Sequence, residues 1–190
     1  MQATRTPPEH YTRQSLLDLS RPRTALLLNL AAIPLVVGMV AAFNYGIRLI
    51  LPGVCFLSPN KWPQLLLGFV VVIILHEAIH GFFFWLFTRQ RPTFSFKGAY
   101  AFAAAPDWYL PRNQYMIVGL SPLVLISLAA AAIFVIFPLS ATTYFIVLSA
   151  ILNASGAIGD LVVIAWVLRR SSAALVRDQG DRFSILEPEP

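Results

Sequence analysis

Four long apolar stretches set the main constraint on how this chain can fold. They cover residues 24–51, 64–88, 114–137 and 141–168. A helix needs about 20 mainly apolar residues to cross a bilayer, and backbone surrounded by lipid must satisfy its hydrogen bonds internally, as a helix does. Since 57% of the residues are hydrophobic and only 12% are charged, a water-soluble globular fold is excluded. The sequence therefore predicts an all-α membrane protein with four transmembrane helices.

The basic residues lie mainly on one side of these predicted spans. They precede the first span, lie between the second and third, or follow the fourth: Arg5, Arg13, Arg21, Arg23, Arg89, Arg91, Lys97, Arg112, Arg169, Arg170, Arg177 and Arg182. Only Arg48 and Lys61 fall on the other side. Because loops rich in Lys and Arg stay in the cytoplasm, we expect both termini to be cytoplasmic.

The charge distribution also bears on domains and partners. The net charge of +5 is spread over separate loops instead of one dense tract, so we expect contact with an anionic lipid bilayer and no binding of nucleic acid. We predict a cytoplasmic leader over residues 1–23, a transmembrane domain over 24–168 and a cytoplasmic tail over 169–190. The short loops and compact size favour a bacterial plasma membrane over that of an organelle.

The second apolar stretch contains the segment VVIILHEAIHGFFFWLF, in which His76, Glu77 and His80 interrupt a lipid-like helix. Each ionisable residue inside a bilayer carries an energetic penalty and is therefore a candidate functional residue. Residues four apart project from one helix face, so the two imidazoles can bind one zinc ion while Glu77 holds a water. This H-E-x-x-H pattern predicts a zinc site. The simpler alternative is a hydrogen-bonded polar seam between helices.

Asp160 is the expected third zinc ligand. It is the only acidic residue in the predicted spans besides Glu77, and the single cysteine, Cys55, cannot form a thiolate cluster. The second and fourth spans run in the same direction, and both His80 and Asp160 lie eight residues before the end of their span. At 1.5 Å per residue each lies roughly 12 Å from that end, so the side chains can meet at one level. The alternative is a structural partner for one histidine.

Asn153 lies seven residues, or about two helical turns, before Asp160 and therefore points in the same direction. Two roles stay open for it. Its amide could donate a hydrogen bond to a substrate carbonyl or oxyanion, as a catalytic residue. It could equally form a hydrogen bond between helices.

The segments HEAIHG and NASGAIGD resemble the two motifs of a family of integral-membrane zincin peptidases, and they are similar to those of the site-2 protease group of intramembrane zinc metalloproteases. The resemblance covers roughly residues 64–168. It implies zinc held by His76, His80 and Asp160, Glu77 as the catalytic base, and cleavage of a peptide bond within or beside the membrane. The proline that site-2 proteases carry in their second motif is missing here.

The connection RPTFSFKGAYAFAAAPDWYLP, between the second and third spans, alternates aromatic and smaller residues with a rough period of two. This pattern favours a short strand-like or re-entrant element between helices 2 and 3. Its free edge could pair with an extended substrate. An amphipathic loop against the lipid headgroups is the alternative.

We therefore expect an intramembrane zinc metalloprotease that hydrolyses peptide bonds of membrane-embedded or membrane-proximal protein or peptide substrates by a zinc-activated water. The main alternative is a non-catalytic metal-binding membrane protein, a carrier or sensor, in which Glu77 is a spare ligand. A scaffold whose polar residues only join helices is a further alternative. No pattern in the chain specifies one particular substrate or an oligomeric state.

Overall fold

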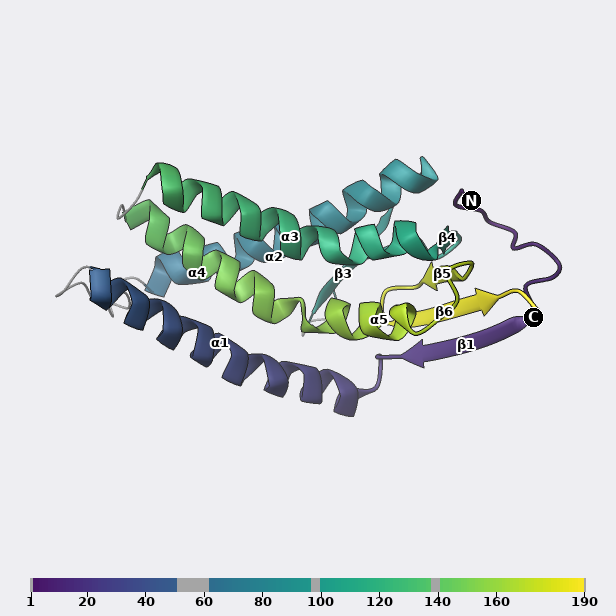
Figure 1. Cartoon of the computed structure of the whole chain (residues 1–190), viewed down its shortest axis with the longest axis horizontal. Coiled ribbons are helices and arrows are strands. Elements are labelled where there is room, and N and C mark those ends of the chain that lie inside the picture. Colours follow the sequence, from purple (N-terminus) through teal and green to yellow (C-terminus); the bar gives the residue numbers. More distant parts are fainter. Residues whose placement is uncertain (1, 51–61, 97–99, 138–140, 190) are drawn as a thin grey trace.

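The structure is a computed structural model that describes residues 2–50, 62–96, 100–137 and 141–189 (Figure 1). Its helices are α1 Pro22–Ile50, α2 Trp62–Thr88, α3 Arg112–Ile136, α4 Ala141–Gly156 and α5 Ile158–Leu168. Its strands are β1 Arg13–Asp18, β2 Thr93–Phe96, β3 Ala101–Ala104, β4 Tyr109–Pro111, β5 Leu175–Asp178 and β6 Arg182–Glu187. The helices form an elongated bundle, and the sheet that contains β1, β5 and β6 lies at one end of it, together with both termini (Figure 1).

The prediction of an all-α protein with four transmembrane helices is wrong. Six strands form two sheets, and among the described residues only α2, over Leu66–Thr88, and α3 are long and apolar enough to cross a membrane as single helices. Helices α4 and α5 together pass the same test but are bent by 46°. In α1 the apolar segment is shorter, over Leu26–Ala42. Length and hydropathy in the sequence do not distinguish an unbroken span from a broken or partial one.

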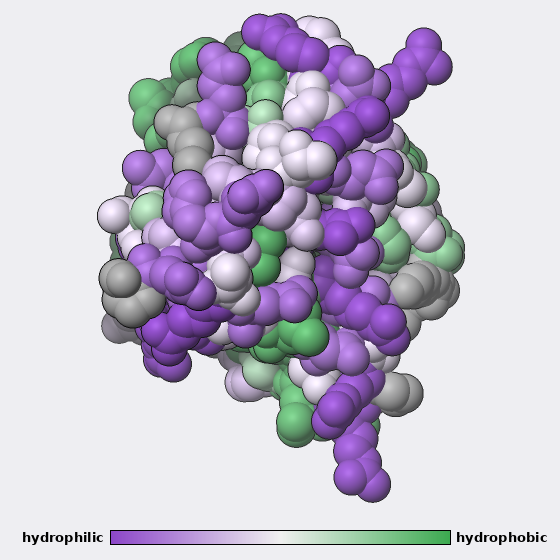
Figure 2. All heavy atoms as spheres, turned by 90° about the vertical axis from the view of Figure 1, so that its right-hand side faces the viewer, coloured by the Kyte–Doolittle hydropathy of each residue, from purple (hydrophilic) through white to green (hydrophobic). Residues whose placement is uncertain are grey.

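The larger sheet joins the two ends of the chain. Its order is β1-β6-β5-β4, and every neighbouring pair is antiparallel. Strand β1 lies in the region predicted as a leader, and β5 and β6 lie in the region predicted as a tail. The division into leader, membrane domain and tail stays a prediction. The strands of the predicted leader and of the predicted tail pair in one sheet. Figure 2, which faces this end of the molecule, shows mainly hydrophilic residues there.

One hydrophobic core connects this sheet to the helices. Leu110, Val176 and Ile185 from three neighbouring strands are fully buried, and they pack in one cluster with Phe84 of α2 and Val167 of α5. Burial of these side chains fixes the sheet against the ends of the helices. The sheet is therefore an integral part of the fold.

The smaller sheet is the β2–β3 hairpin, with Phe94 paired to Ala103 and Ser95 to Phe102. It lies where the sequence indicated a strand-like element; Lys97 and Gly98, between its strands, lie outside the described residues. The hairpin packs on α2, and Gly81 permits this contact because a Cβ atom there would collide with the Phe94 ring. Strand β3 is thereby held beside the helix that carries the two histidines.

Candidate metal centre

The two histidines of α2 point into the helix bundle. They lie four residues apart in an otherwise apolar helix, so they share one face of it. The side chain of His80 is 9% exposed and that of His76 is 12% exposed. Their imidazole rings are 4.8 Å apart between centroids and nearly perpendicular. Both rings can therefore direct a nitrogen to one common point.

Asp160, in the first turn of α5, approaches both histidines of α2. Its Oδ2 lies 3.0 Å from Nε2 of His76 and 3.6 Å from Nε2 of His80, and the two Nε2 atoms are 3.1 Å apart. The three residues form a group whose ligand atoms all lie within 4.8 Å of one another and could hold a metal ion. The convergence that helix depth predicted is thus present.

The bend between α4 and α5 places Asp160 at this point. The bend lies at Ala157, and Asp160 follows in the first turn of α5. A carboxylate in the first turn is favoured by the positive end of the helix dipole. Gly156 and Gly159 flank the bend, and a Cβ atom at either position would meet nothing within 4 Å. The break therefore both orients the carboxylate and leaves space beside it.

The outer nitrogens of both imidazoles are engaged by groups that accept hydrogen bonds. His80 Nδ1 lies 2.9 Å from the carbonyl oxygen of Val118, and His76 Nδ1 lies 2.8 Å from Oδ1 of Asn153. The Asn153 amide is oriented by its own donation from Nδ2 to the carbonyl oxygen of Pro122, at 3.3 Å. Each Nδ1 must therefore carry the proton, which leaves the lone pair of each neutral imidazole on Nε2.

This arrangement fits a zinc ion. Two Nε2 atoms and one carboxylate oxygen face one another at 3.0 to 3.6 Å, and such acceptors repel unless a proton or a metal cation lies among them. Zinc binds two imidazoles and a carboxylate in catalytic sites and leaves a fourth position open. The outer hydrogen bonds to Val118 and Asn153 are of the kind that orient metal-bound histidines. A cavity of about 220 Å³, lined by all three ligands, provides room at the open position.

Glu77 lies at the wall of this cavity, next in sequence to His76. The backbone N–H of Ala103 in β3 faces its carboxylate. Glu77 also lines a second cavity between α2 and the β2–β3 hairpin. Its carboxylate is therefore positioned between the metal ligands and the hairpin, within reach of both cavities.

The side chain of Asn153 is 2% exposed, and both atoms of its amide have partners within the protein. The Asn153 amide thus contacts the imidazole of His76, on the side away from Asp160, and the backbone of α3. Of the two roles open from the sequence, this contact corresponds to the hydrogen bond between helices.

Sequence reasoning missed a buried polar pair on the same cavity. The hydroxyl of Tyr115 in α3 donates to Oδ2 of Asp178, at the end of β5, over 2.9 Å. Burial raises the pKa of the Asp178 carboxyl to about 7. No local pattern marked Asp178 because it lies in the region assigned to a solvated tail. Val118 was also missed, since it contributes through its backbone carbonyl and any residue could do so.

Comparison with known proteins agrees with this geometry. The sequence profile of the family described as "Putative zincin peptidase" matches residues 69–176. The matched region begins in α2 ahead of both histidines and ends in β5, so it contains Glu77 and all three candidate ligands. No curated protein sequence and no solved structure gives a significant match to the chain. Zinc, the metal that this family implies, also suits the donor set.

Proposed function

The chain belongs to the zincin peptidase family, since the match covers more than half of its length, and on this basis we propose that it is an intramembrane zinc metalloprotease. The observation that carries the proposal is the convergence of two Nε2 lone pairs and the Asp160 carboxylate beside the carboxylate of Glu77. His76, His80 and Asp160 are the proposed metal ligands, and Glu77 is the proposed catalytic base.

The proposed reaction is hydrolysis of a peptide bond. When bound, zinc supplies a water of lowered pKa and polarises the peptide carbonyl. Glu77 accepts a proton from the attacking water and delivers it to the leaving nitrogen as the C–N bond breaks. The Ala103 N–H faces the Glu77 carboxylate and would help to orient it. Asn153 acts as a positioning residue, because its buried amide fixes the ring of His76.

The second cavity supports entry of substrate from the lipid. It measures about 850 Å³ and is lined by apolar residues of α2 and of the hairpin, such as Phe69, Ile74 and Phe94. Glu77, Tyr100, Ala101 and Phe102 line this cavity and the metal cavity alike. An apolar peptide segment that lies in the second cavity would therefore reach Glu77 directly.

Strand β3 supports binding of that segment in an extended form. A helical peptide hides its carbonyl groups in its own hydrogen bonds, so a protease needs it unwound. Within the described residues β3 pairs with β2 alone, and its Ala103 N–H points to Glu77. The edge away from β2 thus lies at the catalytic carboxylate, where an extended peptide could add as a strand.

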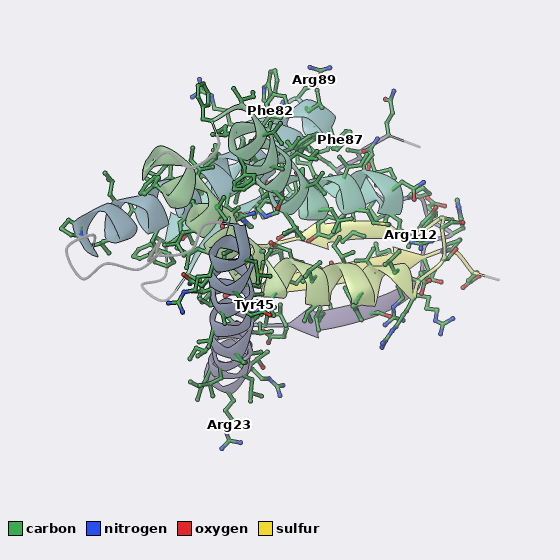
Figure 3. All side chains as sticks on the ribbon, turned by 60° about the vertical axis from the view of Figure 1, so that its left-hand side comes forward. Arg23, Tyr45, Phe82, Phe87, Arg89 and Arg112 are labelled. Atoms are coloured by element: carbon green, nitrogen blue, oxygen red, sulfur yellow. The ribbon has the colours of Figure 1, made fainter. Side chains whose placement is uncertain are left out.

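The arginine and tryptophan side chains support a position in the membrane with the larger sheet on the cytoplasmic side. Trp85, Trp108 and Trp166 each lie under an arginine guanidinium, at 5.1 to 5.7 Å from the ring centroid. Such residues favour the membrane interface. Arg23 and Arg89 project away from the fold in Figure 3, where they could reach lipid headgroups. We propose both termini as cytoplasmic and a bacterial plasma membrane as the location.

Two variants test the proposed function on detergent-purified protein. Asp160→Ala should lose stoichiometric zinc, because an anionic ligand is removed, whereas the exposed Asp107→Ala should keep it. Glu77→Gln should keep zinc, lose about 10²- to 10⁴-fold in turnover, and trap uncleaved membrane peptides that mass spectrometry can identify. Wild-type protein that binds zinc and cleaves none of the peptides trapped by Glu77→Gln would refute the protease and favour a carrier or sensor.

A further inference from the structure

The turn that joins β5 to β6, residues 178–182, is fixed by bonds within the turn and to the N-terminal region. The Gly180 N–H donates to Oδ1 of Asp178 over 2.7 Å, and the Gln179 N–H donates to the Arg182 carbonyl over 3.0 Å. Gly180 has a φ of 93°, a conformation that favours glycine. The Asp181 carbonyl accepts the N–H of Leu19 at 2.8 Å. The turn is therefore a rigid projection of the larger sheet.

This turn contacts the β2–β3 hairpin. The Tyr100 hydroxyl, just before β3, donates to Oδ2 of Asp181 over 3.0 Å. The ring of Phe102 lies so close to Gly180 that a Cβ atom at position 180 would collide with it. The two contacts come from alternate residues on one side of β3, so the turn supports that strand at two points. The close approach at Phe102 requires glycine.

The contact lies at the metal cavity. Asp178, Gly180 and Asp181 line that cavity together with Tyr100 and Phe102. Tyr100 and Phe102 also line the apolar cavity beside Glu77. The turn thus supports the strand at residues that border both the metal cavity and the proposed substrate cavity. The third connection, from Asp178 to Tyr115, ties the same turn to α3.

We propose that the β5–β6 turn is a positioning element that holds strand β3 at the mouth of the metal cavity, with Gly180 and Asp181 as its positioning residues. The part of this inference that concerns substrate rests on the proposed function. Among the described helices and strands, α2 is the other element with repeated contacts to the hairpin, and a two-stranded hairpin is marginally stable by itself. Residues near the C-terminus would in this way determine how well an extended substrate binds.

The direct test measures access to β3 and does not depend on catalysis. In full-length, zinc-loaded Cys55→Ser protein, Ala104→Cys introduces a single thiol at a β3 position that is 1% exposed and does not line the cavity. Its rate of reaction with a water-soluble maleimide reports opening of the hairpin. Tyr100→Phe and Asp181→Ala should each raise this rate about tenfold, the scale of losing a hydrogen bond to a charged group. The double variant should react no faster than the single ones.

Matched controls and kinetics complete the experiment. Tyr45→Phe and Asp107→Ala change exposed residues of the same types and should leave the rate unchanged. With a quenched fluorescent peptide of extended Leu- and Ala-rich sequence, Tyr100→Phe should raise KM several-fold with kcat and zinc content unchanged. An unchanged labelling rate in both single variants would overturn the inference even if the protein is a protease. Faster labelling with an unchanged KM would overturn the role in substrate binding and leave the protease proposal standing.

Discussion

Replacing Asn153 by alanine is the most informative single perturbation of this site. The change removes the oxygen that lies 2.8 Å from Nδ1 of His76 and also removes the amide N–H that donates to the carbonyl of Pro122. The helix backbone should tolerate the substitution, because alanine has the highest helix propensity. His76 then loses the group that keeps its proton on Nδ1 and its lone pair on Nε2. We expect weaker zinc binding with little change in the fold.

The size of the effect follows from the burial of the contact. Asn153 is 2% exposed, so water cannot readily replace the lost acceptor, and an unsatisfied buried donor costs about 1–3 kcal/mol. Loss of a partner that orients a metal-bound histidine typically lowers metal affinity by about 10- to 100-fold. At about 1.4 kcal/mol for each factor of ten, the two figures agree.

The assay is competition for zinc between the detergent-purified protein and a chromophoric chelator. Ser149→Ala is the matched control, since it removes from the same helix a hydroxyl that donates to the Phe145 carbonyl of that helix. Wild type and Ser149→Ala should bind zinc with equal affinity. Asn153→Ala should bind it about 10- to 100-fold more weakly.

The opposite pattern would refute this reasoning. If Asn153→Ala kept zinc affinity within twofold of wild type but lost turnover at saturating zinc, Asn153 would act on the substrate, as an oxyanion donor does. If saturating zinc restored full turnover, its role would be limited to positioning His76.

Three further predictions concern stability. Removing zinc with a chelator should lower the thermal unfolding midpoint, and zinc but not calcium should restore it, because the converging lone pairs need a cation and calcium prefers oxygen ligands. The folded-state pKa of Asp178, about 7, exceeds its ordinary value of 3.8. Between these two values the folded protein binds a proton that the unfolded chain does not bind, so the free energy of unfolding should fall as pH rises from about 4 to 7. Asp178→Asn should reduce this difference between unfolding curves measured at pH 5 and pH 8. Ile185→Ala, at a fully buried position of β6, should destabilise the protein by about 2–5 kcal/mol in denaturant unfolding, whereas Leu16→Ala, at a 72% exposed position of β1, should stay within about 0.5 kcal/mol.

Part of the fold was visible in the sequence because it depends on local composition. The apolar runs marked the helices α2 and α3, since lipid-compatible backbone must be helical. The larger sheet was not visible, because β1 and β6 pair residues such as Leu16 and Ser184 from opposite ends of the chain. Nothing in the local sequence of these two short strands indicates that they pair with each other. The bend at Ala157 was missed for a related reason, since the apolar character continues across it.

The sequence by itself determined the ligand types and their approximate meeting point. Two histidines at a spacing of four and one aspartate within a predicted span leave few alternatives, because each polar group in an apolar span needs a partner. Only the tertiary structure decided how these groups act. The lone pairs of both imidazoles are directed inward by Asn153 and by the Val118 carbonyl, and Glu77 faces an N–H of β3. These partners are mostly backbone atoms, whose positions depend on how the helices and the hairpin pack and not on which residue carries them.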